Sequence, residues 1–261
     1  GNTSVLKPAS FTSITALMLG EVFQEVDLPP GVANIVAGPG GTAGEELAAS
    51  PLVDKTAFTG STEVGRRIMQ LASGTVKPVT LELGGKSANI VLDDADLDIT
   101  AAVTLWGTFF HNGQVCESGT RALVHKSIYD EFLSLLADKA GKIVIGSQMD
   151  FETDLGPLVA RSPADTVRRC VALGREEIGE PICGGSEPEG LAEGLVTENF
   201  YRNDYHLISP ERPFGGYKQS GIGRELGIQG LRAYQQVKHL HANPGGSRDN
   251  YIHLSALSGN I

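Results

Sequence analysis

One cysteine and one glutamate in this sequence have the chemical types that covalent catalysis requires. Cys116 stands among Gly113, Ser118 and Gly119, where a backbone can come close to a ligand. Glu82 follows the β-branched pair at 79–80 and precedes two glycines. The intervening residues 83–115 leave room for a strand, a helix and a loop that bring the two together. A thiol and a carboxylate so placed form a nucleophile and a base.

Each of the two residues also has an ordinary structural interpretation. A lone cysteine is commonly a small buried hydrophobe, although the polar neighbours Gln114, Glu117 and Ser118 argue against deep burial here. His111 lies shortly before the cysteine and leaves open a cysteine–histidine pair like that of cysteine hydrolases. Glu82 can be an exposed acid at the end of a strand. In a partly apolar cleft, its pKa would instead rise towards that of a useful general base.

The composition and net charge exclude several classes of protein. The 261 residues carry a net charge of −10, and 41% are hydrophobic, which fits one large or two modest globular domains. Nucleic-acid binding needs a basic face, so we expect none. Three cysteines without a CxxC motif indicate neither a disulfide framework nor a zinc site and favour a cytoplasmic setting. We see no membrane span and no signal peptide, and expect the natural start to lie upstream.

The hydrophobic pattern alternates strands with helices. Strands are expected at 4–7, 33–37, 55–59, 78–82, 88–92 and 121–124, with a later candidate at 237–242. Helices are expected at about 12–26, 42–49, 61–71, 96–106, 128–140, 164–173 and 225–234. Strands separated by helix-length connections predict right-handed parallel βαβ units and therefore an α/β fold.

A glycine-rich turn at 60–65 joins an expected strand to an expected helix. Backbone N–H groups and the helix dipole favour a phosphate in that setting. The turn matches neither the Walker loop nor the GxGxxG pattern. The alternative is an ordinary turn in which Ser61 caps the helix.

Five motifs, taken together and in order, are far more specific than any one of them. They are Val-Leu-Lys-Pro at 5–8, Phe-Thr-Gly-Ser-Thr-Glu-Val-Gly at 58–65, Leu-Glu-Leu-Gly-Gly-Lys-Ser at 81–87, Gly-Gln-Val-Cys-Glu-Ser-Gly-Thr-Arg at 113–121 and Pro-Phe-Gly-Gly-Tyr-Lys-Gln-Ser-Gly-Ile-Gly-Arg at 213–224. With them the chain closely resembles the aldehyde dehydrogenase superfamily, in its hydrolytic, NAD(P)-dependent form. The resemblance runs from residue 1 to about 194 and resumes from about 203 to 240.

The resemblance implies a chemical role for both residues singled out above. Cys116 matches the family nucleophile, which forms a thiohemiacetal and then a thioester, and its backbone N–H matches one oxyanion donor. Glu82 matches the base that activates water to release the acid. NAD is the implied cofactor, and NADP is also compatible, because Ser10 replaces a glutamate that contacts the ribose in many relatives. No metal site is implied. The implied cofactor-binding residues are Lys7, Ser10, Gly40, Gly44, Phe58, Thr59, Gly60, Ser61, Val64, Leu83 and Gly84.

The resemblance also implies an organisation with missing parts. We expect a partial Rossmann-like parallel-sheet cofactor domain over 1–84 and a partial α/β catalytic domain over 85–236, with an internal deletion near 196–202. An oligomerisation strand and an unassigned tail follow over 237–261. The implied activity is oxidation of a small-molecule aldehyde to a carboxylic acid, in a homo-oligomer that is a dimer or a tetramer. The alternatives are a weak or inactive remnant that acts as an oligomerisation partner, and a cofactor-independent cysteine esterase.

Overall fold

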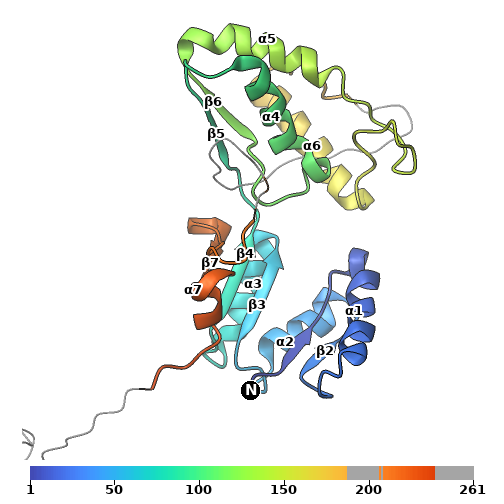
Figure 1. Cartoon of the computed structure of the whole chain (residues 1–261), viewed down its shortest axis with the longest axis vertical. Coiled ribbons are helices and arrows are strands. Elements are labelled where there is room, and N and C mark those ends of the chain that lie inside the picture. The colour runs from blue at the N-terminus through green and yellow to red at the C-terminus, as the bar shows by residue number, and fades with distance from the viewer. Residues whose placement is uncertain (187–205, 207, 239–261) are drawn as a thin grey trace, which may run out of the picture.

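The computed structural model describes residues 1–186, 206 and 208–238. The elements form two parts, one above the other in Figure 1, and residues 84–87 lead from the last strand of the lower part into the first strand of the upper part. The fold is α/β with parallel strand pairs, as the sequence predicted. In the described residues, no helix has the length and apolar character needed to span a membrane.

The lower part begins with alternating strands and helices. They are β1 (Ser4–Leu6), η1 (Ser10–Thr12), α1 (Ser13–Glu25), β2 (Ala33–Ile35), the π-helical turn η2 (Gly40–Gly44), α2 (Glu45–Ala49), β3 (Thr56–Gly60), α3 (Thr62–Ser73) and β4 (Val79–Leu83). β1 pairs in parallel with β2, and β3 pairs in parallel with β4. The predicted βαβ units are therefore present, although the two pairs belong to separate sheets.

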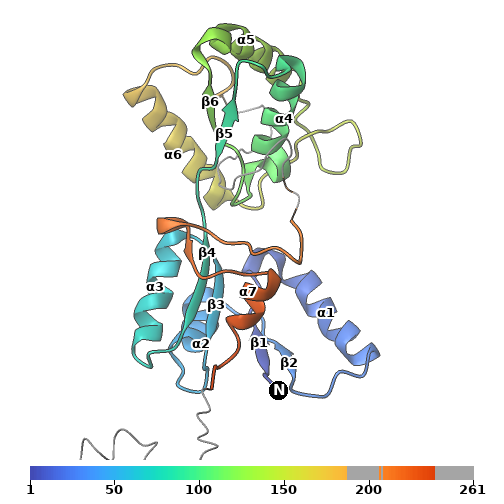
Figure 2. The ribbon, with the colours of Figure 1, turned by 60° about the vertical axis from the view of Figure 1, so that its left-hand side comes forward.

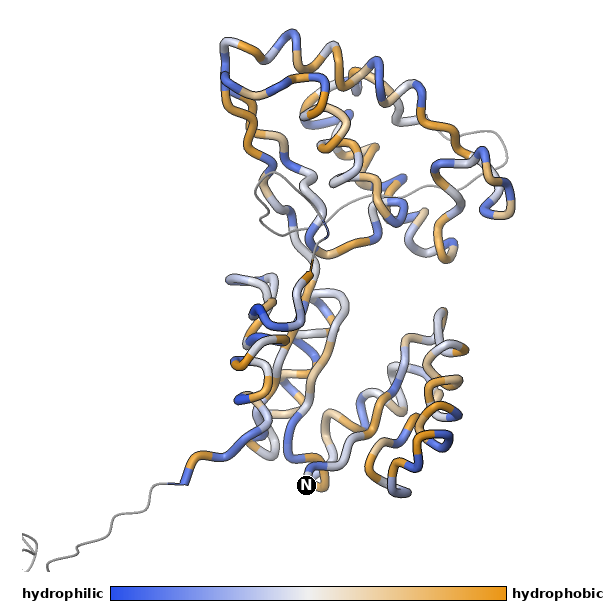
Figure 3. The backbone as a smooth tube through the Cα atoms, viewed as in Figure 1, coloured by the Kyte–Doolittle hydropathy of each residue, from blue (hydrophilic) through white to orange (hydrophobic). Residues whose placement is uncertain are grey.

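β4 is the central strand of its sheet and the best buried strand in the lower part. Its last four residues are all buried, and Leu81 and Leu83 join Ile68 of α3 in one apolar core. Gly65 of α3 allows this close packing, because a Cβ there would lie 2.6 Å from a methyl carbon of Leu83. By contrast, α1 buries none of its residues, and several of its apolar side chains are exposed. Figure 3 shows hydrophobic positions along this helix.

The C-terminal segment returns to the lower part and completes the sheet around β4. The short strand β7 (Gly221–Ile222) pairs antiparallel with β4, so that Gly221 lies opposite Glu82. The 3-10 turn η5 (Lys218–Ser220) precedes β7, and α7 (Gly227–Arg232) follows it beside β4 (Figures 1 and 2). The sequence predicted a helix at 225–234 but no strand before it, because two residues that include a glycine carry no alternating pattern.

Gly221→Ala is expected to loosen this pairing. A Cβ at Gly221 would lie 2.3 Å from the carbonyl oxygen of Leu81, so the two strands must separate. Overpacking of this kind typically costs about 1–3 kcal/mol, and thermal unfolding should show a lowered midpoint. The matched control is Gly174→Ala in α6, where a Cβ would meet no atom within 4 Å. Equal midpoints for Gly221→Ala and wild type would contradict the prediction.

The upper part pairs two strands and packs helices on them. Its elements are β5 (Ala88–Val91), α4 (Leu97–Phe109), η3 (Phe110–Gly113), β6 (Arg121–Val124), η4 (Lys126–Ile128), α5 (Tyr129–Ala140) and α6 (Arg161–Glu177). β5 and β6 are parallel. Asp96 caps α4 by accepting the N–H groups of Asp98 and Ile99. The core is formed by Val91, Ala101 and Phe132.

Some predictions about organisation fall beyond what is described. The internal deletion near 196–202 lies outside the described residues, as does most of the strand expected at 237–242. The division into 1–84, 85–236 and 237–261 stays a prediction. The pairing of β7 with β4 places the segment that contains residues 221–222 against the lower part, beside the strand that carries Glu82.

Candidate active site

Glu82 is a buried carboxylate in the middle of a sheet. It lies on β4 one residue before the strand ends, and only 5% of its surface is exposed. In the described structure its Oε1 atom has no hydrogen-bond partner. Glu82 is therefore not an exposed acid at a strand end. β3 and β7 flank β4 on both sides, so Glu82 lies on the central strand of its sheet.

The surroundings of Glu82 raise its pKa to about 7. Burial is the largest cause, and the nearby carboxylate of Glu225 adds to it. The backbone N–H of Gly216 and the charge of Arg224 act in the opposite direction. A carboxylate with a pKa near neutrality can accept a proton and release it again under ordinary conditions, which a general base requires.

A glycine-rich loop leaves room for this carboxylate. Gly215 lies against Glu82, and a Cβ at this glycine would come within 2.8 Å of Oε1. Gly216 is equally constrained, because its Cβ would meet the carbonyl group of Ser220. The loop at 213–224 therefore needs glycines to fold over Glu82, which gives the expected glycine-rich motif a structural reason.

Cys116 is presented by a left-handed turn at the end of α4. His111, Asn112 and Gly113 have positive φ angles of 54°, 57° and 69°. Asn112 tolerates this conformation better than most residues, and its side-chain amide donates a hydrogen bond to the carbonyl oxygen of Pro157 at 3.0 Å. This hydrogen bond connects the turn to the segment before α6. The half-buried Cys116 follows shortly after the turn.

The thiol of Cys116 donates a hydrogen bond to Oε2 of Glu117 at 3.3 Å. Burial raises the pKa of the thiol to about 12, and the carboxylate of Glu117 is the next cause, with a smaller contribution from Glu82. The hydrogen bond of the thiol goes to Glu117 and not to His111, whose ring packs edge-on against Phe110. The structure therefore gives no support to the cysteine–histidine pair.

The neighbours of Cys116 are far more buried than their polarity suggests. Glu117 is 4% exposed and Ser118 is fully buried. The polar neighbours had argued against deep burial of Cys116, and Cys116 is indeed only half-buried, although these two neighbours are buried themselves. Glu117 is buried because it has partners, since its Oε1 lies 2.6 Å from Nδ1 of His206.

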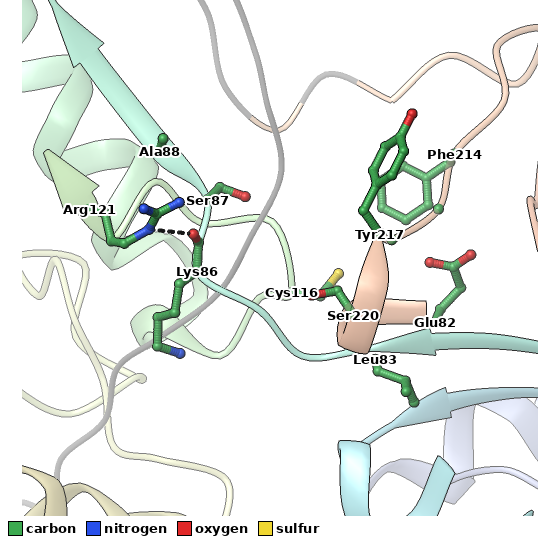
Figure 4. Close-up of a pocket in the computed structure, with 12 residues that line it drawn as sticks. Glu82, Leu83, Lys86, Ser87, Ala88, Cys116, Arg121, Phe214, Tyr217 and Ser220 are labelled. Atoms are coloured by element: carbon green, nitrogen blue, oxygen red, sulfur yellow. Dashed lines mark hydrogen bonds between the residues drawn. The ribbon is translucent and has the colours of Figure 1, made fainter. Parts of the chain in front are cut away.

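Cys116 and Glu82 line the same cavity, which has a volume of about 390 Å³. Figure 4 shows the sulfur and the carboxylate beside the same space, with Phe214 and Tyr217 nearby. The remaining lining residues are Leu83, Lys86, Ser87, Ala88, Arg121, Gly215, Gly216 and Ser220. Lower-part and upper-part residues thus meet at one cavity, where the chain passes from β4 to β5.

The residues expected to bind a cofactor lie at or just after the ends of strands in the lower part. Lys7 and Ser10 follow β1, and Gly40 and Gly44 belong to the π-helical turn after β2. Phe58, Thr59 and Gly60 end β3, Ser61 and Val64 begin α3, and Leu83 and Gly84 end β4. Carboxyl ends of parallel strands form the usual ligand crevice of an α/β sheet. Their role in binding stays a prediction.

The turn at 60–65 contains the serine cap that the sequence predicted, and phosphate binding at this turn stays a prediction. Ser61 caps α3, and its hydroxyl accepts the N–H of Val64 at 3.2 Å. Val64 itself is 44% exposed at the first turn of the helix. The capping hydrogen bond explains the serine, and it leaves the start of the helix accessible.

Sequence reasoning missed three titratable residues around the two candidates. Glu225 raises the pKa of Glu82 from a position far along the chain. Glu117 and His206 form a buried pair next to Cys116, although 89 residues separate them. Of these three residues, only Glu117 could have been found from the sequence, because it is adjacent to Cys116. No local sequence pattern identifies His206 as its partner.

Comparisons with known proteins agree with this geometry. The model of the aldehyde dehydrogenase family matches residues 1–200 and 191–240. A betaine aldehyde dehydrogenase of Bacillus subtilis (strain 168) is 35% identical over an alignment 321 positions long, gaps included, which covers 97% of this chain and 66% of that protein. The chloroplastic betaine aldehyde dehydrogenase of Beta vulgaris is 46% identical over an alignment 307 positions long, which covers 92% of this chain and 61% of that protein.

A solved structure shares the fold. A betaine aldehyde dehydrogenase double mutant from Staphylococcus aureus, in complex with NAD⁺, superposes with a TM-score of 0.87 at 30% identity. The match covers 95% of this chain and 64% of that chain, so this chain spans about two thirds of the proteins it matches or slightly less. Family model, relatives and fold all lead to one conclusion: the chain belongs to the aldehyde dehydrogenase family.

Proposed function

We propose that this chain carries the catalytic nucleophile and base of an enzyme that oxidises an aldehyde to a carboxylic acid with NAD. The observation that carries the proposal is the shared cavity, where the thiol of Cys116 and the buried carboxylate of Glu82 face each other from two parts of the fold. The NAD⁺ complex of the Staphylococcus aureus relative supports the choice of cofactor.

The lower part has features that suit a dinucleotide. Gly40 and Gly84 present bare backbone, because a Cβ at either position would meet no atom within 4 Å. The ammonium group of Lys7 is held near the π-helical turn by the carbonyl oxygen of Gly38 at 3.3 Å, and its side chain packs against Gly44. Accessible backbone, a fixed cation and an accessible helix start suit a phosphate-bearing ligand. We assign the adenosine side to Lys7, Ser10, Gly40 and Gly44.

The remaining cofactor residues lie closer to the reacting groups. Phe58, Thr59, Gly60, Ser61 and Val64 would guide the pyrophosphate and nicotinamide, and Leu83 and Gly84 would border the nicotinamide. Leu83 also lines the cavity that holds Cys116. When bound, NAD supplies the acceptor for the hydride that leaves the aldehyde carbon.

The residues of this chain divide the reaction into two halves. The sulfur of Cys116 attacks the carbonyl carbon, and the thiol proton passes through solvent to the carbonyl oxygen. The product is a thiohemiacetal whose oxygen accepts the backbone N–H of Cys116. Loss of hydride to the cofactor and of the hydroxyl proton to solvent converts the thiohemiacetal to a thioester. Glu82 then removes a proton from water, which attacks the thioester, and the carbon–sulfur bond breaks to release the acid and restore the thiol.

The test measures binding and chemistry separately. Addition of NAD should raise the midpoint of thermal unfolding, since a ligand at 100 times its Kd stabilises the native state by about 2.7 kcal/mol. Addition of an aldehyde, with betaine aldehyde as the first choice, should then produce NADH and an equal amount of acid. An unchanged midpoint at saturating NAD would contradict the cofactor assignment. Ester hydrolysis without NAD would favour the esterase instead.

A further inference from the structure

Glu117 is a buried carboxylate that makes contacts with both of its oxygens. Oε2 accepts the S–H of Cys116 at 3.3 Å, and Oε1 lies 2.6 Å from Nδ1 of His206. The side chains of Glu117 and His206 are only 5% and 8% exposed. A buried carboxylate persists only where partners compensate its lost hydration, and here the thiol is one of those partners.

His206 fixes the direction of this carboxylate. Its ring packs against Phe110, with centroids 4.6 Å apart, and meets the edge of Trp106 at 6.3 Å. Both aromatic residues belong to the end of α4 and the turn that follows, which also presents Cys116. The contact with His206 therefore holds Glu117 in one position relative to the sulfur.

We propose that Glu117, held by His206, keeps Cys116 as a neutral, hydrogen-bonded thiol in the resting site. A thiolate at this position would stand next to a buried carboxylate, and two like charges at this distance repel strongly where water is scarce. The thiol form avoids that repulsion and gains the hydrogen bond. The nucleophile then becomes reactive only when this hydrogen bond is broken.

The other titratable groups of the cavity contribute less. Glu82 on β4 also disfavours the thiolate, but it ranks behind burial and Glu117. Lys86, Arg121 and Tyr217 line the same cavity, yet none of them is among the causes of the shifted thiol pKa. Among the charged side chains, Glu117 is therefore the one whose charge should affect the ionisation of Cys116 most strongly.

The experiment is the pH dependence of alkylation of Cys116 by iodoacetamide, followed by mass spectrometry of the peptide that contains it. The probe reacts with thiolates, needs neither aldehyde nor NAD, and so reports on the thiol whether or not the proposed oxidation occurs. Cys170 and Cys183 are exposed and would react as well. They are replaced by serine in every variant, except where Cys170 serves as a reference.

Glu117→Gln should lower the pH midpoint of alkylation and accelerate the reaction at neutral pH. Glutamine keeps the volume and one acceptor oxygen, replaces the other oxygen with an N–H donor, and removes the charge. Each unit by which the thiol pKa falls raises the thiolate fraction at neutral pH about tenfold. The thiolate also becomes a weaker nucleophile as its pKa falls, so the alkylation rate should rise about threefold per unit. The control is Glu131→Gln, an exposed glutamate in the first turn of α5, which should leave the rate unchanged.

Two outcomes would overturn the proposal. One is a folded Glu117→Gln variant, with the circular dichroism of wild type, whose alkylation midpoint does not fall. The other needs no variant: in the wild-type chain, Cys116 must ionise at higher pH than the exposed Cys170. A midpoint for Cys116 at or below that of Cys170 would show that Glu117 does not hold the proton, even if Glu117→Gln failed to fold.

Discussion

Cys116→Ala is expected to abolish aldehyde-dependent formation of NADH. The substitution removes the only atom in the cavity that the proposed mechanism joins covalently to the substrate, and alanine leaves the fold of the turn intact. Removal of the nucleophile from a covalent mechanism typically lowers the rate on the order of 10⁴-fold or more. The measurement is initial-rate NADH formation, combined with mass spectrometry of the protein for an acyl adduct.

The controls separate chemistry from folding. Cys170→Ser and Cys183→Ser replace exposed thiols outside the cavity, and both should keep the wild-type rate. Cys116→Ala should still show the rise in unfolding midpoint with NAD, because none of the assigned cofactor residues has changed. Equal rates for Cys116→Ala and wild type would remove Cys116 from the mechanism and leave the proposed function without its nucleophile.

The parts of the fold that were predictable depend on local signals. Asp96 caps α4 because an aspartate before an apolar-periodic run satisfies N–H groups two and three residues ahead. Ser61 caps α3 by the same rule. The parallel pairing of β3 with β4 follows from the helix-length connection between them. In each case the cause and the effect lie close together in the sequence.

What could not be predicted depends on contacts between distant segments. β7 exists because β4 offers an edge at Leu81 and Glu82, not because residues 221–222 favour a strand. The burial of Glu117 depends on His206, and the raised pKa of Glu82 depends on Glu225. The sequence identified Cys116 and Glu82 by residue type and motif, but their electrostatic environment is a property of the assembled fold.

In this environment, the two glutamates Glu82 and Glu117 are suited to different roles. Glu82 faces the cavity with an oxygen that has no partner in the described structure, whereas both oxygens of Glu117 are engaged. A carboxylate with a free oxygen can accept a proton from water, and one with two partners is suited to hold a group in place. The two acids can therefore act at different stages of one reaction.

Glu82→Gln is expected to stop the reaction after its first half. Glutamine has nearly the same shape but cannot take a proton from water, and loss of a general base typically lowers the rate about 10²–10⁴-fold. Acylation of Cys116 does not use Glu82, so one equivalent of NADH per site should form rapidly and then cease. The measurement is rapid-mixing NADH formation, with the trapped thioester identified by mass.

The raised pKa of Glu82 also predicts how the rate of thioester hydrolysis by the wild type depends on pH. The pKa of Glu82 is raised to about 7, so the carboxylate form that accepts a proton is scarce below neutrality and dominant above it. Thioester hydrolysis should therefore rise with pH through about 7 and level off.

Glu225→Gln removes a neighbouring charge that raises the pKa of Glu82, so the midpoint of the rise should move to lower pH while the plateau rate stays the same. Glu82→Gln should lack the rise altogether. Parallel loss of the burst and of steady turnover in Glu82→Gln would instead assign Glu82 to acylation or to folding.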